Sequence, residues 1–220
     1  MEIQIVNNWM WLCIAFGVML LTVLIKSFQS RYFYTHDVVE RKFSTMDLEL
    51  PSSAQELVNI IKGIFLLPVD KSQKTLKALK GQLYVDFIFM PAAYGSVFLV
   101  CMIVAGKMSH LGNYVFSVLG WLQIVAWLCD IIENIYLLNK IDPGVVPSQP
   151  AIHKAWQVLE ITKWGIVMTG TVCAVFGLIY FWLVGHYSYS SLCYLLIIIG
   201  EIVFFIIADK MLSKKSKSNT

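Results

Sequence analysis

Five stretches of apolar residues, each long enough to cross a lipid bilayer, constrain this chain more than any other feature of its sequence. A transmembrane helix needs about 20 predominantly apolar residues. Of the 220 residues, 58% are apolar and only 14% are charged, whereas about a quarter of the residues of a soluble domain are charged. We therefore predict an all-α polytopic membrane protein with five transmembrane helices, at about 9–25, 84–106, 114–138, 164–184 and 189–208.

The first apolar stretch is predicted to be a retained helix rather than a cleaved secretory signal. Glu2 is the only charged residue ahead of it, where a signal peptide has a basic region. Lys26 follows it without the small-residue cleavage site of a signal peptide. All five stretches are therefore expected to stay in the membrane.

Lysine and arginine residues are divided very unequally between the loops, and this division predicts the orientation of the helices. Alternate loops, together with the C-terminal tail, place sixteen basic residues on one side of the membrane and Lys107 alone on the other. Basic residues accumulate on the cytoplasmic side of membrane proteins. The N-terminus is therefore predicted to face outward and the C-terminus the cytoplasm, in a multi-pass protein of the cytoplasmic (inner) cell membrane.

The cytoplasmic loop 26–83 is the only sizeable part outside the predicted spans. Ser53 and Glu56 have the spacing of a capping box, in which each side chain binds a free backbone N–H at the start of a helix. This signal predicts an amphipathic helix at 54–67 that lies on the membrane or packs under the bundle. Its apolar face carries Leu57, Ile60, Ile61 and Ile64.

The rest of the chain shows no division into several domains. We see no internal repeat of the kind on which many transporters are built. Residues 1–210 are therefore predicted to form a single transmembrane bundle. The lysine- and serine-rich residues 211–220 are predicted to be a disordered basic tail.

Lysines recur at every third position just before the second span. Ammonium groups there can hold the headgroups of anionic lipids, or can simply anchor the helix while their stems lie along the apolar surface. With only two arginines in the chain, no arginine-rich face for a nucleic acid is evident. Membrane lipids are thus an expected partner and nucleic acids are not. The lysines in question are Lys71, Lys74, Lys77 and Lys80.

Four acidic residues lie inside apolar stretches, where a charged side chain is costly and is a functional candidate by default. The predicted helix directions place all four in the cytoplasmic half of the bundle, although neighbouring helices run in opposite directions. This shared depth is not required by the topology and suggests a common polar site. The four residues are Asp86, Asp130, Glu133 and Glu201.

The third span brings three of its polar residues onto one face. Asp130, Glu133 and Asn134 are spaced at i, i+3 and i+4, which are neighbouring positions on a helix surface. Small residues in the second span allow a close approach of another helix. We therefore expect the second and third spans to pack together with Asp86 facing this triplet, and Tyr94 two turns further along the second span.

The carboxylates admit three states, which the sequence leaves open. They are protonated, they bind a cation, or they pair with lysines at the cytoplasmic ends of the spans. The lysines that could reach them are Lys26, Lys80 and Lys163. Carboxylate and amide oxygens suit Mg²⁺ or another divalent cation, which would make Asp86, Asp130 and Glu133 candidate metal ligands. A purely structural role, with hydrogen bonds between helices, is an equal alternative. Glu160 and Asp209 lie near the predicted boundary and are given no role.

Three segments together resemble a group of bacterial integral membrane proteins of uncharacterised function that share LDLE, DFxF…Y and DxxEN elements. The resemblance extends over about residues 43–138 and implies no activity. It implies that Asp47 and Glu49 belong with the buried acids, whereas alone they are typical of a solvated loop. The three segments are Phe43–Leu50, Asp86–Phe89 with Tyr94–Gly95, and Asp130–Asn134.

The leading functional hypothesis is a cytosol-facing pocket that binds a cation or the polar head of a lipid, as in a lipid-modifying enzyme. In it, Asp86, Asp130 and Glu133 would be ligands or proton acceptors, and Asn134 and Tyr94 would orient the ligand. One alternative is a small proton- or ion-coupled transporter, expected as a homo-oligomer. Another is a non-catalytic subunit of a membrane-protein partner with structural carboxylates. The sequence decides neither whether the chain is an enzyme nor which residues would be catalytic.

Overall fold

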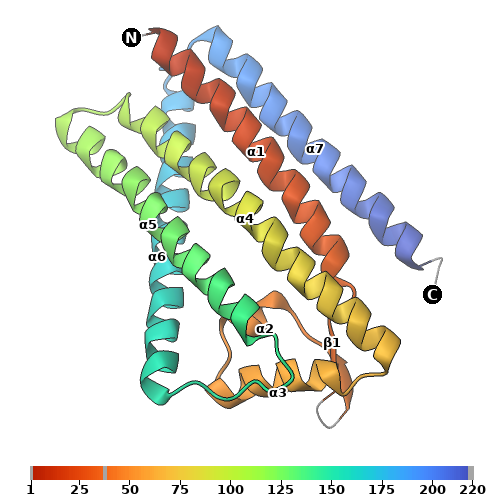
Figure 1. The fold of residues 1–220 in the computed structure, drawn as a ribbon. Coiled ribbons are helices and arrows are strands. Elements are labelled where there is room, and N and C mark those ends of the chain that lie inside the picture. Colours follow the sequence, from red (N-terminus) through yellow and green to blue (C-terminus); the bar gives the residue numbers. More distant parts are fainter. Residues whose placement is uncertain (1, 37–38, 218–220) are drawn as a thin grey trace. The chain divides into compact units, whose positions relative to one another are not determined.

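The computed structural model describes residues 2–36 and 39–217, over which the chain forms seven helices and one short β-hairpin (Figure 1). Five of these helices are long and apolar enough to cross a membrane. The prediction of a helical fold with five helices able to cross a membrane is therefore confirmed. The five long helices are α1 (Glu2–Ser30), α4 (Val69–Ala105), α5 (His110–Lys140), α6 (Pro150–Leu183) and α7 (Tyr189–Lys217).

The long helices extend well beyond the predicted spans. Helix α4 begins at Val69 rather than near residue 84, so the lysine-rich segment is helical and continuous with the apolar one. The carbonyl of Pro68 accepts the backbone N–H groups of Lys71 and Ser72, which closes the first turn. Lysine is a good helix former, so the helix needs no apolar composition to continue there.

Helix α7 also passes its predicted end at residue 208 and continues to Lys217. Residues 211–217 of the predicted disordered tail are thus helical, and residues 218–220 lie outside the described residues. Lysine and leucine in this stretch maintain the helix. Helix α6, in turn, begins at Pro150, because proline is well suited to the first helical position.

The contacts divide the chain into two compact units. Unit 1 comprises Met1–Leu24, Ile88–Trp127 and Trp164–Thr220. Unit 2 comprises Ile25–Phe87 and Leu128–Lys163. Helices α1, α4, α5 and α6 each contribute residues to both units.

Unit 2 contains the loop between the first two spans, and this loop is more ordered than the sequence suggested. Strands β1 (Tyr34–His36) and β2 (Glu40–Lys42) pair antiparallel in a hairpin that was not predicted. Two short helices follow, α2 (Thr45–Glu49) and α3 (Ala54–Phe65). Figure 1 shows the hairpin, α2 and α3 gathered in one part of the molecule.

Helix α3 corresponds to the helix predicted at 54–67. The Ser53 hydroxyl accepts the backbone N–H of Glu56 at 3.2 Å, as expected. The Glu56 carboxylate, however, binds the backbone N–H of Ser52 at 2.7 Å rather than that of Ser53, so the predicted capping box is only half formed. The location of α3 at a membrane surface stays a prediction.

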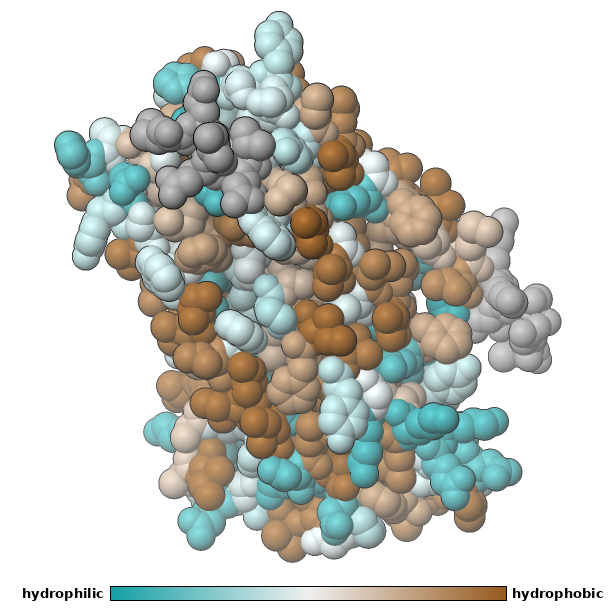
Figure 2. Space-filling view, turned by 45° about the horizontal axis from the view of Figure 1, so that its top comes forward, coloured by the Kyte–Doolittle hydropathy of each residue, from teal (hydrophilic) through white to brown (hydrophobic). Residues whose placement is uncertain are grey.

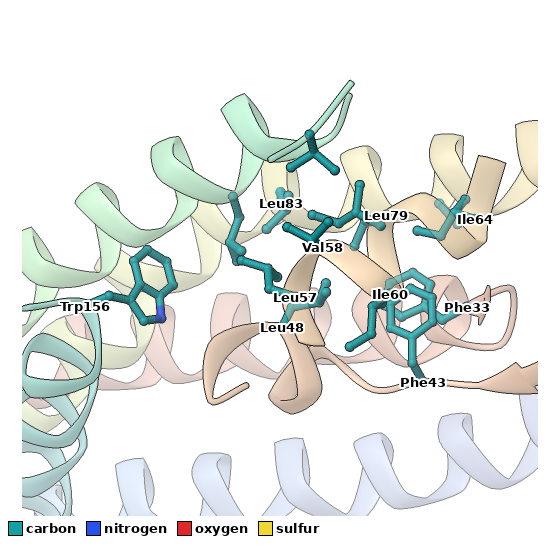
Figure 3. Packing of buried hydrophobic residues seen from close by; sticks show 14 residues of the cluster. Phe33, Phe43, Leu48, Leu57, Val58, Ile60, Ile64, Leu79, Leu83 and Trp156 are labelled. Carbon is teal, nitrogen blue, oxygen red and sulfur yellow. The ribbon is translucent and has the colours of Figure 1, made fainter. Parts of the chain in front are cut away.

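The core of unit 2 forms around α3 (Figure 3). The rings of Phe33 and Phe43 stack with centroids 5.2 Å apart next to Ile60. Leu79 and Leu83 of α4 close the other side and are at most 1% exposed. This packing joins the hairpin and α3 to the N-terminal half of α4, where the predicted site residues begin.

Unit 1 consists of the more apolar portions of the long helices. The rings of Trp9 and Tyr187 meet edge to face, with centroids 5.5 Å apart. Gln123 is fully buried, and its amide donates to the carbonyl of Ile166 at 3.4 Å. Apolar side chains cover much of the face of the molecule seen in Figure 2, as expected for helices whose outer surface is solvated by lipid.

Candidate cation-binding site

Four carboxyl groups and one ammonium group meet inside unit 2. The carboxyl groups come from Glu49 at the end of α2, from Asp130 and Glu133 on α5, and from Glu160 on α6. The ammonium group belongs to Lys163, one turn beyond Glu160 on α6. One ligand atom from each of the three glutamates lies within 4.8 Å of the other two, close enough for a single metal ion to contact all three.

Lys163 lies at the centre of this carboxylate cluster. Its Nζ is 3.1 Å from Asp130 Oδ1 and 2.9 Å from Glu160 Oε2, and it also contacts Glu133 Oε2. The lysine is 3% exposed and Glu133 is 1% exposed. A lysine at the start of the fourth predicted span therefore reaches the acids of the third, which is one of the states that the sequence left open.

Glu160 is the most deeply buried member of the cluster. It is 0% exposed, and no N–H, hydroxyl or ammonium group that the structure describes donates a hydrogen bond to its carboxyl oxygens. Its side chain does share a hydrogen bond with the Glu133 carboxyl, which requires a proton on one of the two. Oε2 lies 2.9 Å from Lys163 Nζ, but this is an ion pair without hydrogen-bond geometry. A buried charge is costly unless it is both paired and hydrogen-bonded, so the cluster needs either a proton shared between its carboxyls or a further cation.

Glu49 is held in the cluster by its backbone. Helix α2 starts with a capping box formed by Ser44 and Asp47, and Trp156 Nε1 donates to the Glu49 carbonyl at 2.9 Å. Its side chain is only partly buried. Burial raises the pKa of the Glu49 carboxyl from 4.5 to about 7; nearby Lys163 opposes this change and Glu160 adds to it.

Asp86 forms a separate pair next to the cluster. It makes a salt bridge with Lys26 of α1, and Asn134 Nδ2 donates to Asp86 Oδ2 at 3.2 Å and to the Leu83 carbonyl at 3.4 Å. The expected approach of Asp86 to the polar face of α5 is thus present, but it involves Asn134. Asp130 and Glu133 instead bind Lys163 of α6.

The remaining predicted residues occupy other surroundings. Tyr94 is buried on α4 within unit 1, and Glu201 lies on α7 within unit 1, so neither belongs to the cluster. Lys71 binds Glu40 and stands 4.1 Å from the ring centroid of Tyr34. The other lysines of this series are exposed on α4 and are Lys74, Lys77 and Lys80.

Two members of the cluster were not expected from local sequence. Glu160 was given no role because it precedes the predicted fourth span, although its i, i+3 spacing to Lys163 is a signal of shared helix face. Glu49 was connected with the acids only through the resemblance. Asp47, which the resemblance also connected with them, caps α2 instead.

The chemistry of the cluster suits a hard cation. Four carboxyl groups face one ammonium, which leaves three negative charges uncompensated when all are ionised. Carboxylate oxygens are the ligands that Mg²⁺ and Ca²⁺ prefer, and Lys163 contacts Oδ1 of Asp130 and Oε2 of Glu133 and of Glu160. Comparison of the chain with models of known protein families, with curated proteins and with solved structures gives no match.

Proposed function

We propose that the chain is a multi-pass protein of the bacterial cytoplasmic membrane that binds a divalent cation of the Mg²⁺ class at the carboxylate cluster. The observation that carries this proposal is the meeting of three glutamate carboxyls, each with an oxygen within 4.8 Å of the other two, of which Glu133 and Glu160 are fully buried. A divalent cation would be held by Glu49, Glu133 and Glu160, and it supplies Lewis acidity to an oxygen-containing ligand.

Charge balance supports a cation in addition to the lysine. With Lys163 in place, the fully ionised cluster has three excess negative charges, and a divalent ion reduces this excess to one. The Lys163 ammonium contacts Oδ1 of Asp130 and one Oε2 each of Glu133 and Glu160. The proposed metal ligands include Glu49 and leave out Asp130, so the cation and the ammonium need not occupy the same point in the cluster.

The direction of access supports a cytosolic and lipid-facing role. Glu49 is the partly exposed member of the cluster, and the orientation predicted from the basic residues places its loop in the cytoplasm. Exposed lysines on α4 would attract anionic lipid headgroups to the surface of unit 2, at about 1 kcal/mol for each ammonium near the membrane surface. These lysines are Lys74, Lys77 and Lys80.

The proposal can be tested by titrating the purified protein with Mn²⁺. Electron paramagnetic resonance measures the bound Mn²⁺, and Mg²⁺ is added as a competitor. We expect one saturable site in the wild type, weakened at least tenfold by Glu160→Gln and by Glu133→Gln. Glu56→Gln is the matched control, because Glu56 is a carboxylate of unit 2 that binds Ser52 outside the cluster. Equal Mn²⁺ affinity in wild type and Glu160→Gln would refute the proposal.

A structural ion-pair network is the second candidate, favoured by the contacts of Lys163 with three acids from two helices. In that case the chain would be a non-catalytic membrane subunit. This candidate predicts that neither the wild type nor any variant binds Mn²⁺ saturably. Glu160→Gln should then change only the thermal stability. The same titration therefore separates the two candidates, because only the cation site gives saturable binding in the wild type.

A further inference from the structure

Unit 1 contains a pocket that is independent of the carboxylate cluster. It has a volume of about 200 Å³ and lies between α1 and α7. An apolar cavity of about 150 Å³ is known to hold a benzene molecule, so this pocket has room for an aromatic ring and a short side chain. Its walls are Leu20, Leu21 and Leu24 of α1, and Phe204 and Phe205 of α7, with Gly17 and Glu201.

Glu201 gives this apolar pocket a single polar group. Its Oε2 is buried and has no hydrogen-bond partner among the residues described. It is also the only ionisable residue among those that line the pocket. A carboxyl group in a candidate membrane span is costly unless something pairs with it, and nothing in the wall of this pocket does so.

The opposite helix is shaped to accept this carboxyl. A Cβ atom at Gly17 would lie 2.9 Å from Glu201 Oε1, so the carboxyl rests directly against the backbone of α1. Any larger residue at this position would push it aside. The glycine therefore allows Glu201 to stay within the pocket, where Oε1 meets α1 and Oε2 is left for a ligand.

We propose that this pocket binds a lipophilic primary ammonium ion, with Glu201 as its counter-ion and Phe204 and Phe205 against its apolar body. Charge complementarity favours this ligand: an ammonium neutralises the carboxylate and donates a hydrogen bond to Oε2. Aromatic faces attract cations, and leucine side chains cover the hydrocarbon portion. The proposal does not depend on the cation site of unit 2, since no residue is shared.

Two ligands of nearly the same shape, 2-phenylethylamine and 2-phenylethanol, test the proposal by saturation-transfer NMR with the full chain in phosphatidylcholine nanodiscs. We expect saturable binding of the amine, at least tenfold tighter than that of the alcohol, and absent from empty nanodiscs. Glu201→Gln should weaken amine binding at least tenfold. Asp209→Asn, which removes a carboxyl eight residues further along the same helix, should leave it unchanged.

The comparison of amine and alcohol uses the wild type, so it holds even where Glu201→Gln fails to accumulate as a folded protein. Equal affinity for the two ligands would overturn the proposal and make Glu201 a neutral hydrogen-bonding group. Unchanged amine binding in folded Glu201→Gln would overturn it as well. A third contrary result is a stable dimer that dissociates on Glu201→Gln with no amine binding in the wild type, because a second copy would then fill the pocket.

Discussion

Replacing Lys163 by methionine removes the one ammonium group that contacts three buried acids, while retaining a side chain of similar length. The lysine is 3% exposed, and removal of one partner from a buried ion pair costs about 3–5 kcal/mol because it leaves uncompensated charge. For a chain of this size, 1 kcal/mol changes Tm by about 2–4 °C. We therefore expect Tm to fall by roughly 6–20 °C.

If the cluster binds a divalent cation, that cation should restore part of the stability lost in Lys163→Met. A ligand at 100 times its Kd stabilises the folded state by about 2.7 kcal/mol, equivalent to roughly 5–11 °C here. In Lys163→Met the cation no longer faces an ammonium and gains the oxygens that the lysine occupied. At one fixed concentration, Mn²⁺ should therefore raise the Tm of the variant by more than that of the wild type.

Thermal unfolding in detergent, followed by tryptophan fluorescence with and without Mn²⁺, measures both effects. Lys80→Met is the matched control, because Lys80 is an exposed lysine on α4 and its loss should change Tm by less than about 2 °C. A Tm of Lys163→Met equal to that of the wild type in the absence of Mn²⁺ would refute the expected loss of stability. An increment from Mn²⁺ no larger than in the wild type would show that the Lys163 ammonium does not oppose binding of the cation.

Three further predictions concern pH and topology. Because burial raises the pKa of the Glu49 carboxyl from 4.5 to about 7, the folded protein retains this proton where the unfolded chain releases it. The free energy of unfolding should thus fall between about pH 4.5 and pH 7, by at most about 1.4 kcal/mol per pH unit, and titration of Glu49→Gln should lack this component. Mn²⁺ affinity should rise through pH 7 in the wild type, since ligands must be deprotonated, and a flat profile would exclude Glu49 as a ligand. Because the C-terminus is predicted to face the cytoplasm, alkaline phosphatase fused to it should be inactive, and green fluorescent protein fused to it should be fluorescent. The reverse result would show that the predicted topology is inverted.

The positions of the five long helices followed from hydropathy because a bilayer accepts few alternatives to an apolar helix. Their ends did not, since apolar composition stops where the solvent changes rather than where the helix stops. In α4 the lysines before residue 84 are good helix formers, and Pro68 marked the true start. The hairpin β1–β2 was missed because its strands have three residues each, too few for an alternating pattern.

The site was predictable only as far as a single helix allowed. The spacing of Asp130, Glu133 and Asn134 correctly places them on one face of α5, but it does not say which neighbours that face meets. In the structure the residues of this face have different partners. Asn134 donates a hydrogen bond to Asp86, and the two acids form ion pairs with Lys163 of α6. Such partners depend on packing between distant segments, which local patterns do not contain.

The hydrogen bond from Trp156 Nε1 to the Glu49 carbonyl has a consequence for the order of events during synthesis. The two residues are separated by 107 positions in the chain. At about 5–20 residues per second, Glu49 leaves the ribosome roughly 5–20 s before its partner exists. Over that interval, the second and third spans must insert while α2 has no Trp156 to hold it. The cluster is therefore completed only after α6 has emerged, and a nascent chain cut before residue 156 should lack it.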